Sequence, residues 1–179
     1  MLVQSDRFGT LDIADEDAIV FPNGLIGFPN DDRFVLLRPN ADSRIAWLQS
    51  TKSPSLSLPV VSLHATAIDA PLDIIAETAK NLAIAESPED CAVMLVVTVR
   101  AGERATVNLL APLLVNAATR TGVQAMLDID PRGLTTPLCL RPEPNDSETN
   151  DAGEANDAEA PMAATNGTST TITIIHAAE

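Results

Sequence analysis

Short apolar runs separated by turn residues fill the chain up to about residue 140, and this spacing is the feature that most constrains the fold. Each run has the length of a β-strand. The most β-branched run, residues 93–99, lies between Pro88-Glu89-Asp90 and Ala101-Gly102-Glu103. Pro112 interrupts another run and indicates a sheet edge or a bulge. Including that strongest run, the expected strands are 8–13, 19–21, 34–37, 45–49, 56–61, 93–99, 107–110, 113–116 and 124–129.

One segment, residues 73–85, has a pattern that also suits a helix. We expect a strand to about Ala76, followed by a short helix over residues 77–82. The residues that share the helical face are Ile74, Ile75, Ala79, Leu82 and Ala83. Together these elements predict a mostly β fold: a small, antiparallel, β-barrel-like single domain over residues 1–141, with at most one or two short helices.

The composition determines what the core contains and where we expect the protein to work. With four Phe, one Trp and no Tyr, the core must consist of Val, Ile, Leu and Ala. Cys91 and Cys139 both lie in apolar sequence, which favours two buried thiols over a disulfide or a metal pair. The N-terminus has no signal-peptide pattern, and the longest apolar run, 92–97, is too short for a membrane span. We therefore expect a cytoplasmic protein that makes no membrane contact.

Acidic residues are concentrated after Arg141. Of a net charge of −14, the part up to Arg141 carries −6, and eight acids without any base follow it. The composition of residues 142–167 predicts an acidic disordered linker. The chain ends in residues 168–179, a β-prone tail that either adds to a sheet edge or stays loose. A chain with this negative charge favours a basic protein partner over direct contact with nucleic acid. Acidic residues also aid solubility.

No pattern in the sequence indicates catalysis. The two histidines, His64 and His176, lack the neighbours of a metal site, and neither a GxSxG motif nor a phosphate-binding glycine loop occurs. The acidic clusters at 15–17 and 89–90 are typical of solvated turns. We therefore expect a binding protein, not an enzyme, that uses no cofactor and no metal. An alternative stays open: a β-barrel centred on His64 that binds a small molecule or catalyses a reaction.

Residues 21–28 read FPNGLIGF, an apolar segment that also contains turn formers. Gly24 and Gly27 permit positive φ, so the backbone can bend sharply while apolar side chains project from it. Two interpretations follow. The segment is either a buried corner of the β core or a partly exposed apolar knob that a partner covers.

Three segments in order resemble the flagellar assembly factor FliW family. They are FPNGLIGF at 21–28, WLQS at 47–50, and VNLLAPLLVN at 107–116, the last followed by Gly122-Val123-Gln124 and Leu127. The resemblance covers residues 1 to about 140. The chain departs from the family pattern at Ile26, where the family often has proline, and its tail from Pro142 is longer than the family leads us to expect.

The resemblance implies a non-enzymatic assembly factor of bacterial flagellum biogenesis. Such a factor is implied to act as a chaperone that binds flagellin and to regulate translation by binding CsrA, a basic RNA-binding regulator. Flagellin and CsrA would exchange on it, and this partner switching would relieve repression of flagellin translation. We expect a monomer when the protein is free. The candidate contact residues are Leu25, Ile26, Phe28, Gln49, Asn108 and Asn116, although each asparagine is equally expected to cap backbone groups.

Overall fold

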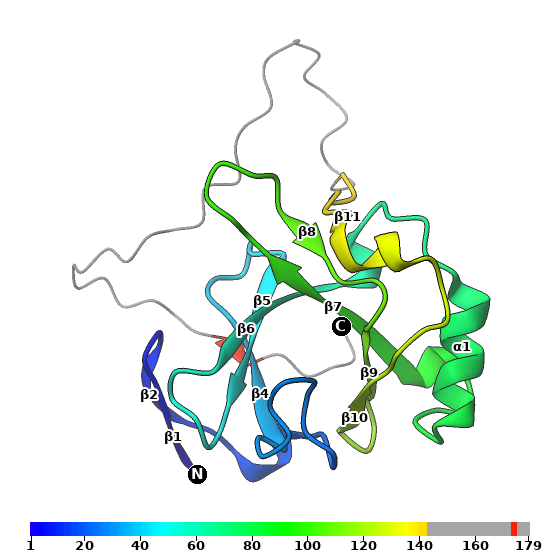
Figure 1. The fold of residues 1–179 in the computed structure, drawn as a ribbon. Helices are drawn as coiled ribbons and strands as arrows, with labels where there is room; N and C mark the ends of the chain where they lie inside the picture. The colour runs from blue at the N-terminus through cyan, green and yellow to red at the C-terminus, as the bar shows by residue number, and fades with distance from the viewer. Residues whose placement is uncertain (143–172, 175–179) are drawn as a thin grey trace.

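Seven strands close into a β-barrel in the computed structural model, which describes residues 1–142 and 173–174 (Figure 1). Around the barrel the strand order is β7-β6-β5-β4-β3-β10-β9, and β9 pairs with β7 to close it. The predicted mostly β, barrel-like fold is thus confirmed. These strands are β3 (Ile19–Val20), β4 (Arg33–Arg38), β5 (Ile45–Ser50), β6 (Ser57–Ser62), β7 (Cys91–Thr98), β9 (Leu113–Asn116) and β10 (Thr121–Gln124).

The other described elements surround this barrel. β1 (Leu2–Ser5) and β2 (Gly9–Asp12) form a separate hairpin, while β8 (Thr106–Val107) and β11 (Thr136–Pro137) extend the sheet from the far end of β7. The helix α1 (Leu72–Asn81) lies beside the barrel, on the side of β7 and β9 (Figure 1). β12 (Thr173–Ile174) pairs with β4. Among residues 1–142 and 173–174, no helix is long and apolar enough to cross a membrane.

One seam of the barrel is parallel, a feature that the predicted antiparallel, barrel-like fold did not include. Thr121 of β10 pairs in parallel with Val20 of β3, whereas the other barrel pairs are antiparallel. Arg120 reinforces this seam: its backbone oxygen accepts the Val20 N–H at 2.8 Å, and its guanidinium donates to the backbone oxygen of Asp17. Burial is the main cause that lowers the pKa of Arg120, an effect that the charge of Asp17 opposes. A strand pattern does not encode this direction, because it shows that a segment is extended but not which strand it meets.

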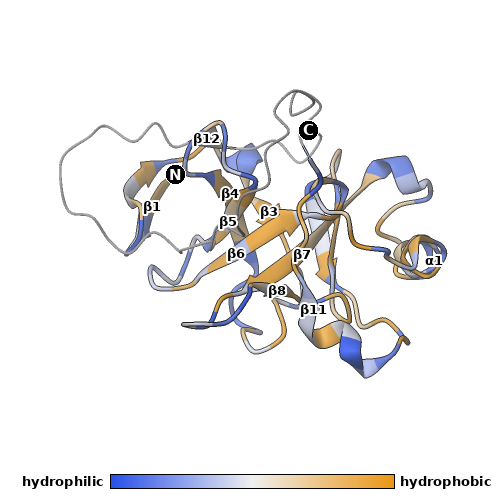
Figure 2. Cartoon of the chain, turned by 90° about the horizontal axis from the view of Figure 1, so that it is seen from above, coloured by the Kyte–Doolittle hydropathy of each residue, from blue (hydrophilic) through white to orange (hydrophobic). Residues whose placement is uncertain are grey.

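Strand alternation divides the core into three clusters, and the orange strands in Figure 2 show how apolar the barrel is. One cluster takes alternate residues from the barrel strands, such as Phe34 and Leu48, and fills the interior. A second takes the opposite face of β7, including Leu95, against α1. The third lies between β4 and the β1–β2 hairpin, where Val3 packs near Leu37. Strand β7 reads as a continuous apolar run because both of its faces are covered.

The helix begins earlier than predicted. Residues 73–76, expected as a strand, form the first half of α1, which directly follows Pro71. Ile75 and Ala79, four residues apart, are buried on the same face and contact the barrel. The helix ends before Ala83, whose φ of 54° is incompatible with further helical turns. Tertiary burial of this apolar stripe, more than local propensity, determines the helical conformation.

Strand boundaries differ from the prediction at several places. β1 was not expected, yet Val3 is only 1% exposed because the hairpin covers the outer face of β4. Of the expected strand 107–110, only Val107 lies in a strand, β8 (Thr106–Val107). Of the expected strand 124–129, only Gln124 does, at the end of β10 (Thr121–Gln124). Beyond those points one backbone hydrogen bond, from Leu127 N–H to Leu110 O at 2.9 Å, joins the two segments, and Pro112, which has no N–H, interrupts the ladder.

The two cysteines differ in environment. Both are free; Cys91 is buried as predicted, whereas Cys139 is exposed, so the prediction of two buried thiols is wrong for Cys139. Cys139 follows β11, where its backbone oxygen accepts the Ala67 N–H at 2.9 Å and its side chain remains at the surface. Apolar neighbours in the sequence indicated burial, but this last segment lies along the outside of the domain.

The predicted linker and tail fall largely outside the described residues. Of the linker at 142–167 only Pro142 is described, and of the tail at 168–179 only β12. Thr173 pairs with Arg38 and Ile174 with Leu37, in antiparallel register. The segment that the sequence predicted as β-prone therefore contributes a short strand to an edge of β4.

Candidate functional site

Residues 25–28 form a tight turn with Ile26 and Gly27 at its two central positions. Phe28 N–H donates to Leu25 O at 2.8 Å, and Leu25 N–H donates to Phe28 O at 3.3 Å. Gly27 has a φ of 89°, which is typical of the third position of a type II turn. Proline is favoured at the second position of such a turn, and this chain has Ile26 there. An apolar side chain at the tip thus replaces the stiffer proline ring.

Gly24 makes this turn possible. Its φ is 65°, and a Cβ atom at this position would lie 2.4 Å from Phe28 O and 2.7 Å from Pro29 Cα. Both are backbone atoms, so a side chain could not be accommodated without moving the chain. Gly27, in contrast, has no atom within 4 Å of the equivalent position. Gly24 is required by close packing of the backbone, and Gly27 by backbone conformation alone.

The turn has a buried base and an exposed tip. Phe21 is fully buried and Leu25 is 3% exposed, whereas Ile26 is 57% and Phe28 is 39% exposed. The Phe21 ring packs edge-to-face on Phe34, with 5.6 Å between ring centroids. Each of the two interpretations of the sequence therefore describes part of the turn. We refer to Ile26 and Phe28 as the turn tip.

Gln124 attaches the turn tip to the barrel. Its Oε1 accepts the Ile26 N–H at 2.8 Å, and its Nε2 donates to Ala111 O at 3.3 Å. Met126, two residues further along, is 63% exposed and adds another apolar side chain to this end of the barrel. The predicted contact set did not include Gln124 or Met126. The sequence contained a signal for Gln124, because Gly122-Val123-Gln124 forms part of the family pattern.

Carboxylates follow the turn closely. Asp31 N–H donates to Phe28 O at 3.2 Å, and the carboxylate of Asp31 accepts a hydrogen bond from Ser50 Oγ at 2.5 Å. Asp32 pairs with Lys52, with 2.7 Å between Oδ1 and Nζ. The hydrogen bond from Lys52 is the main cause that lowers the pKa of Asp32. The turn tip is thus an apolar projection beside an acidic segment, which includes one carboxylate without a described cationic partner.

Gln49 has a role inside the fold. Its side chain is fully buried; its Oε1 accepts from Ser5 Oγ at 2.7 Å, and its Nε2 donates to Ser50 O at 3.0 Å and Ser53 O at 3.2 Å. These bonds join the β1–β2 hairpin to β5 and to the loop after it. Gln49 presents no surface to a partner in this conformation.

Asn108 and Asn116 cap backbone groups. Asn108 Oδ1 accepts the Ala111 N–H at 3.0 Å. Asn116 Oδ1 accepts the Thr119 N–H at 2.8 Å, and its Nδ2 donates to Ile84 O at 2.8 Å. Of the six predicted contact residues, the structure thus brings Leu25, Ile26 and Phe28 into one turn, while the three polar residues stabilise separate loops.

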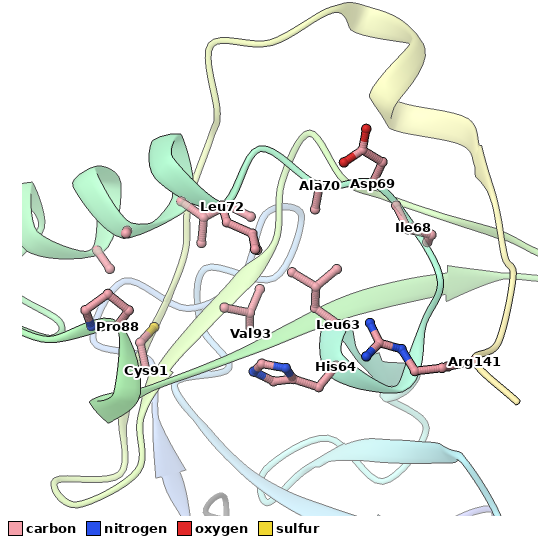
Figure 3. A pocket seen from close by; sticks show the side chains of 13 residues that line it. Leu63, His64, Ile68, Asp69, Ala70, Leu72, Pro88, Cys91, Val93 and Arg141 are labelled. Carbon is pink, nitrogen blue, oxygen red and sulfur yellow. The ribbon is translucent and has the colours of Figure 1, made fainter. Parts of the chain in front are cut away.

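A cavity of about 280 Å³ lies between α1 and the barrel wall, and His64 is at its edge (Figure 3). Most of its lining is aliphatic, including Leu63, Ile75 and Val93. The His64 side chain forms no hydrogen bond or ion pair with any of residues 1–142. Cys91 also lines the cavity, and burial raises the pKa of its thiol, which disfavours the reactive thiolate.

The alternative centred on His64 requires a nucleophile and a base in contact, or a set of metal ligands. The cavity lining described here supplies neither arrangement. Within the described part of the chain, no group of three or more His, Cys, Asp or Glu side chains is placed to hold a metal ion. The turn at residues 25–28 is therefore a better supported candidate site than the cavity beside His64.

A protein-family model described as "FliW protein" matches residues 2–138, which is more than half of the chain. The chain belongs to the FliW family. The resemblance predicted from the three sequence segments is confirmed. The match contains the barrel, the turn and Gln124, and it ends before the acidic residues 142–167.

Curated FliW relatives and a solved FliW structure agree with this assignment. The flagellar assembly factor FliW of Heliobacterium modesticaldum is 34% identical over 154 residues, which cover 86% of this chain and 99% of that protein. The FliW of Magnetococcus marinus is 33% identical over 144 residues, covering 79% and 88%. A crystal structure of the flagellar assembly factor FliW has a TM-score of 0.61 and 27% identity, and it covers 79% of this chain and 98% of that one.

Proposed function

We propose that this FliW-family protein is a non-catalytic, cytoplasmic flagellar assembly factor that binds flagellin and the regulator CsrA in exchange. In this role it acts as a chaperone for flagellin and, by partner switching, relieves repression of flagellin translation. The observation that carries the proposal is the turn tip, where Ile26 is 57% and Phe28 is 39% exposed on an otherwise rigid turn. The names of the relatives support the general role, and the turn tip supports a contact with another protein.

The rigidity of the turn matters for binding. Apolar side chains at a protein interface contribute most when they are already held in their bound arrangement, because little conformational entropy is then lost. Here the buried Leu25, the close packing at Gly24 and the hydrogen bond from Ile26 to Gln124 hold the turn. An exposed isoleucine beside a phenylalanine on such a support is the arrangement of a contact anchor, not of a solvated loop.

Charge gives a second argument, which concerns CsrA in particular. The chain up to Arg141 carries a net charge of −6, and Asp31 lies next to the turn tip. An acidic surface attracts a basic regulator over long range and raises the association rate. The same charge disfavours a phosphate backbone on this surface. We therefore place the protein in contact with the regulator and not with the RNA.

The deciding experiment is Ile26→Asp in the full chain, with Leu72→Asp as the matched control. Leu72 is 64% exposed at the start of α1, away from the turn, so both changes put a carboxylate in place of an exposed aliphatic side chain. Both variants should keep the urea midpoint of the wild type, because surface changes typically cost within about 0.5 kcal/mol.

Binding is then measured by titration calorimetry against purified CsrA and purified flagellin. Ile26→Asp should weaken at least one of the two complexes by about tenfold or more, since one central anchor typically contributes above 1 kcal/mol. Leu72→Asp should leave both unchanged. If Ile26→Asp is folded and binds both partners like the control, the proposal for the turn is wrong.

The contribution of charge is tested by salt. Affinity for CsrA should fall steadily as the salt concentration rises, mainly through a slower association rate. Affinity that does not change with salt would contradict the electrostatic part of the proposal and leave the turn-tip part to be judged by Ile26→Asp.

A further inference from the structure

The outer edge of β4 has two different neighbours. β3 covers only the beginning of the strand, where Ile19 pairs with Phe34 and Val20 with Arg33. At the other end of β4, Leu37 and Arg38 pair with β12. On its inner side β4 pairs continuously with β5 from Phe34 to Leu37. The end of β4 that β3 does not reach is thus covered by the C-terminal segment of the chain.

Such an end is a template for another strand. The backbone N–H and C=O groups of an uncovered strand edge pair readily with any extended segment. Leu37 is fully buried and packs in the cluster between β4 and the hairpin, which keeps this part of the backbone in its extended form. The barrel closes through the mutual pairing of its strands, and the end of β4 that β3 leaves uncovered is a place where an added strand can extend the sheet.

The position of Arg141 supports the pairing of β12 with this end of β4. Arg44, in the connection between β4 and β5, donates through its guanidinium to Arg141 O and to Ala65 O, the latter at 2.8 Å. Arg141 therefore lies at the connection that directly follows Arg38. Arg141 thus lies near the same end of β4 at which β12 pairs.

We propose that Leu37 and Arg38 form a strand-accepting edge, which the chain's own strand β12 (Thr173–Ile174) occupies. The sequence around β12, residues 168–179, is threonine- and isoleucine-rich and alternates as an edge strand does. An extended segment of any other protein can add to β4 at this place only after the chain's own strand has left. This inference is independent of the function proposed for the turn tip.

Tethering favours the chain's own strand. Thirty residues separate Pro142 from Thr173, a length that can span up to about 100 Å, so reach does not limit the pairing. A covalent tether typically gives an effective concentration on the order of millimolar. A free strand of the same sequence at micromolar concentration therefore competes poorly. The edge behaves as an occupied site unless the internal strand is disabled.

The test uses the full chain with Thr173→Pro and Ile174→Pro together. Proline removes the backbone N–H and cannot form a regular pair within a sheet. Ala163→Pro with Ala164→Pro is the matched control, because it adds the same number of prolines to the chain outside residues 168–179. The readout is amide hydrogen exchange at Leu37 and Arg38, followed by NMR.

Neighbouring residues of a strand point their N–H groups to opposite sides, so only one of these two amides faces β12. That amide should exchange at least about tenfold faster in the double variant at 173 and 174 than in the wild type or the control, while the amide that faces β5 should not change. Equal exchange of both amides in all three proteins would overturn the proposal.

A peptide of residues 168–179 provides the second measurement. Added at up to about 2 mM, it should shift the NMR signals of Leu37 and Arg38 in the double variant, with at least tenfold weaker binding to the wild type, whose edge is occupied. Binding that is equal in both proteins, or absent from both, would overturn the assignment of the edge as a strand acceptor.

Discussion

Replacing Gly24 with alanine tests how the turn is built, and Gly27→Ala serves as its matched comparison. Both glycines have positive φ, 65° and 89°, so both changes place an L-residue in a conformation that it disfavours. Only at Gly24 does the new methyl group meet the backbone, 2.4 Å from Phe28 O. The difference between the two variants isolates the steric contribution from the cost of the backbone conformation.

The magnitude follows from the contacts. An L-residue at positive φ costs about 1–2 kcal/mol, and the loss of freedom in the unfolded chain offsets about 0.4–1 kcal/mol of that. Gly27→Ala should therefore cost about 1 kcal/mol. At Gly24 the clash must displace Phe28 O, which accepts hydrogen bonds from Leu25 and Asp31. Loss of these two bonds adds about 2 kcal/mol, so Gly24→Ala should cost roughly 3 kcal/mol.

Urea unfolding gives the measurement. Trp47 is the single tryptophan and is half-buried, with the Arg7 guanidinium 3.6 Å from its ring centroid, so its fluorescence reports unfolding of the barrel. Gly24→Ala should lower the free energy of unfolding by at least about 2 kcal/mol more than Gly27→Ala does, at an unchanged slope. Equal losses in the two variants would refute the steric explanation of the turn.

Three further predictions concern polar side chains. Gln124→Ala removes the acceptor of the Ile26 N–H and should cost about 1 kcal/mol, with faster amide exchange at Ile26 in NMR. Gln49→Ala leaves buried partners such as Ser5 without a hydrogen bond and should cost about 3–5 kcal/mol in urea unfolding. The hydrogen bond from Arg132 is the main cause that lowers the pKa of Asp130 from 3.8 to about 2. The ionised carboxylate therefore stabilises the fold above pH 4, and this contribution is lost as the pH falls through about 2. Asp130→Asn should therefore weaken the fall of the thermal midpoint between pH 4 and pH 2; an unchanged fall would contradict this assignment.

The strands were predictable where one physical signal dominates. The β-branched run at β7 and the short apolar run of β4, bounded by turn residues, indicated strands, because burial of one or both sheet faces leaves a direct pattern in the sequence. The start of α1 was not predictable in this way. Ile74 and Ile75 suit a strand locally, and only the barrel wall that Ile75 contacts makes the helix the better solution.

The candidate site was predictable in part. The glycines and apolar residues of the turn identified the segment, but not which side chains point outward, because that depends on where Phe21 and Leu25 find the core. Gln49 shows the opposite case: a polar residue in a family segment suggested a contact, while its amide is consumed by buried backbone groups. The parallel pair of Thr121 with Val20 had no local signal, since the direction of a pairing depends on the path of the whole chain.

The attachment of the turn tip to Gln124 also determines when the site can exist. The two residues joined by this hydrogen bond are 98 positions apart, and the seam that Arg120 forms with Asp17 spans 103. A ribosome releases the chain from its N-terminus, so the turn emerges long before the residues that fix it. The tip becomes a preorganised surface only when nearly the whole barrel has been synthesised. For the function proposed above, completion of the domain and competence for binding are therefore the same event, and an unfinished chain offers no preorganised turn tip to a partner.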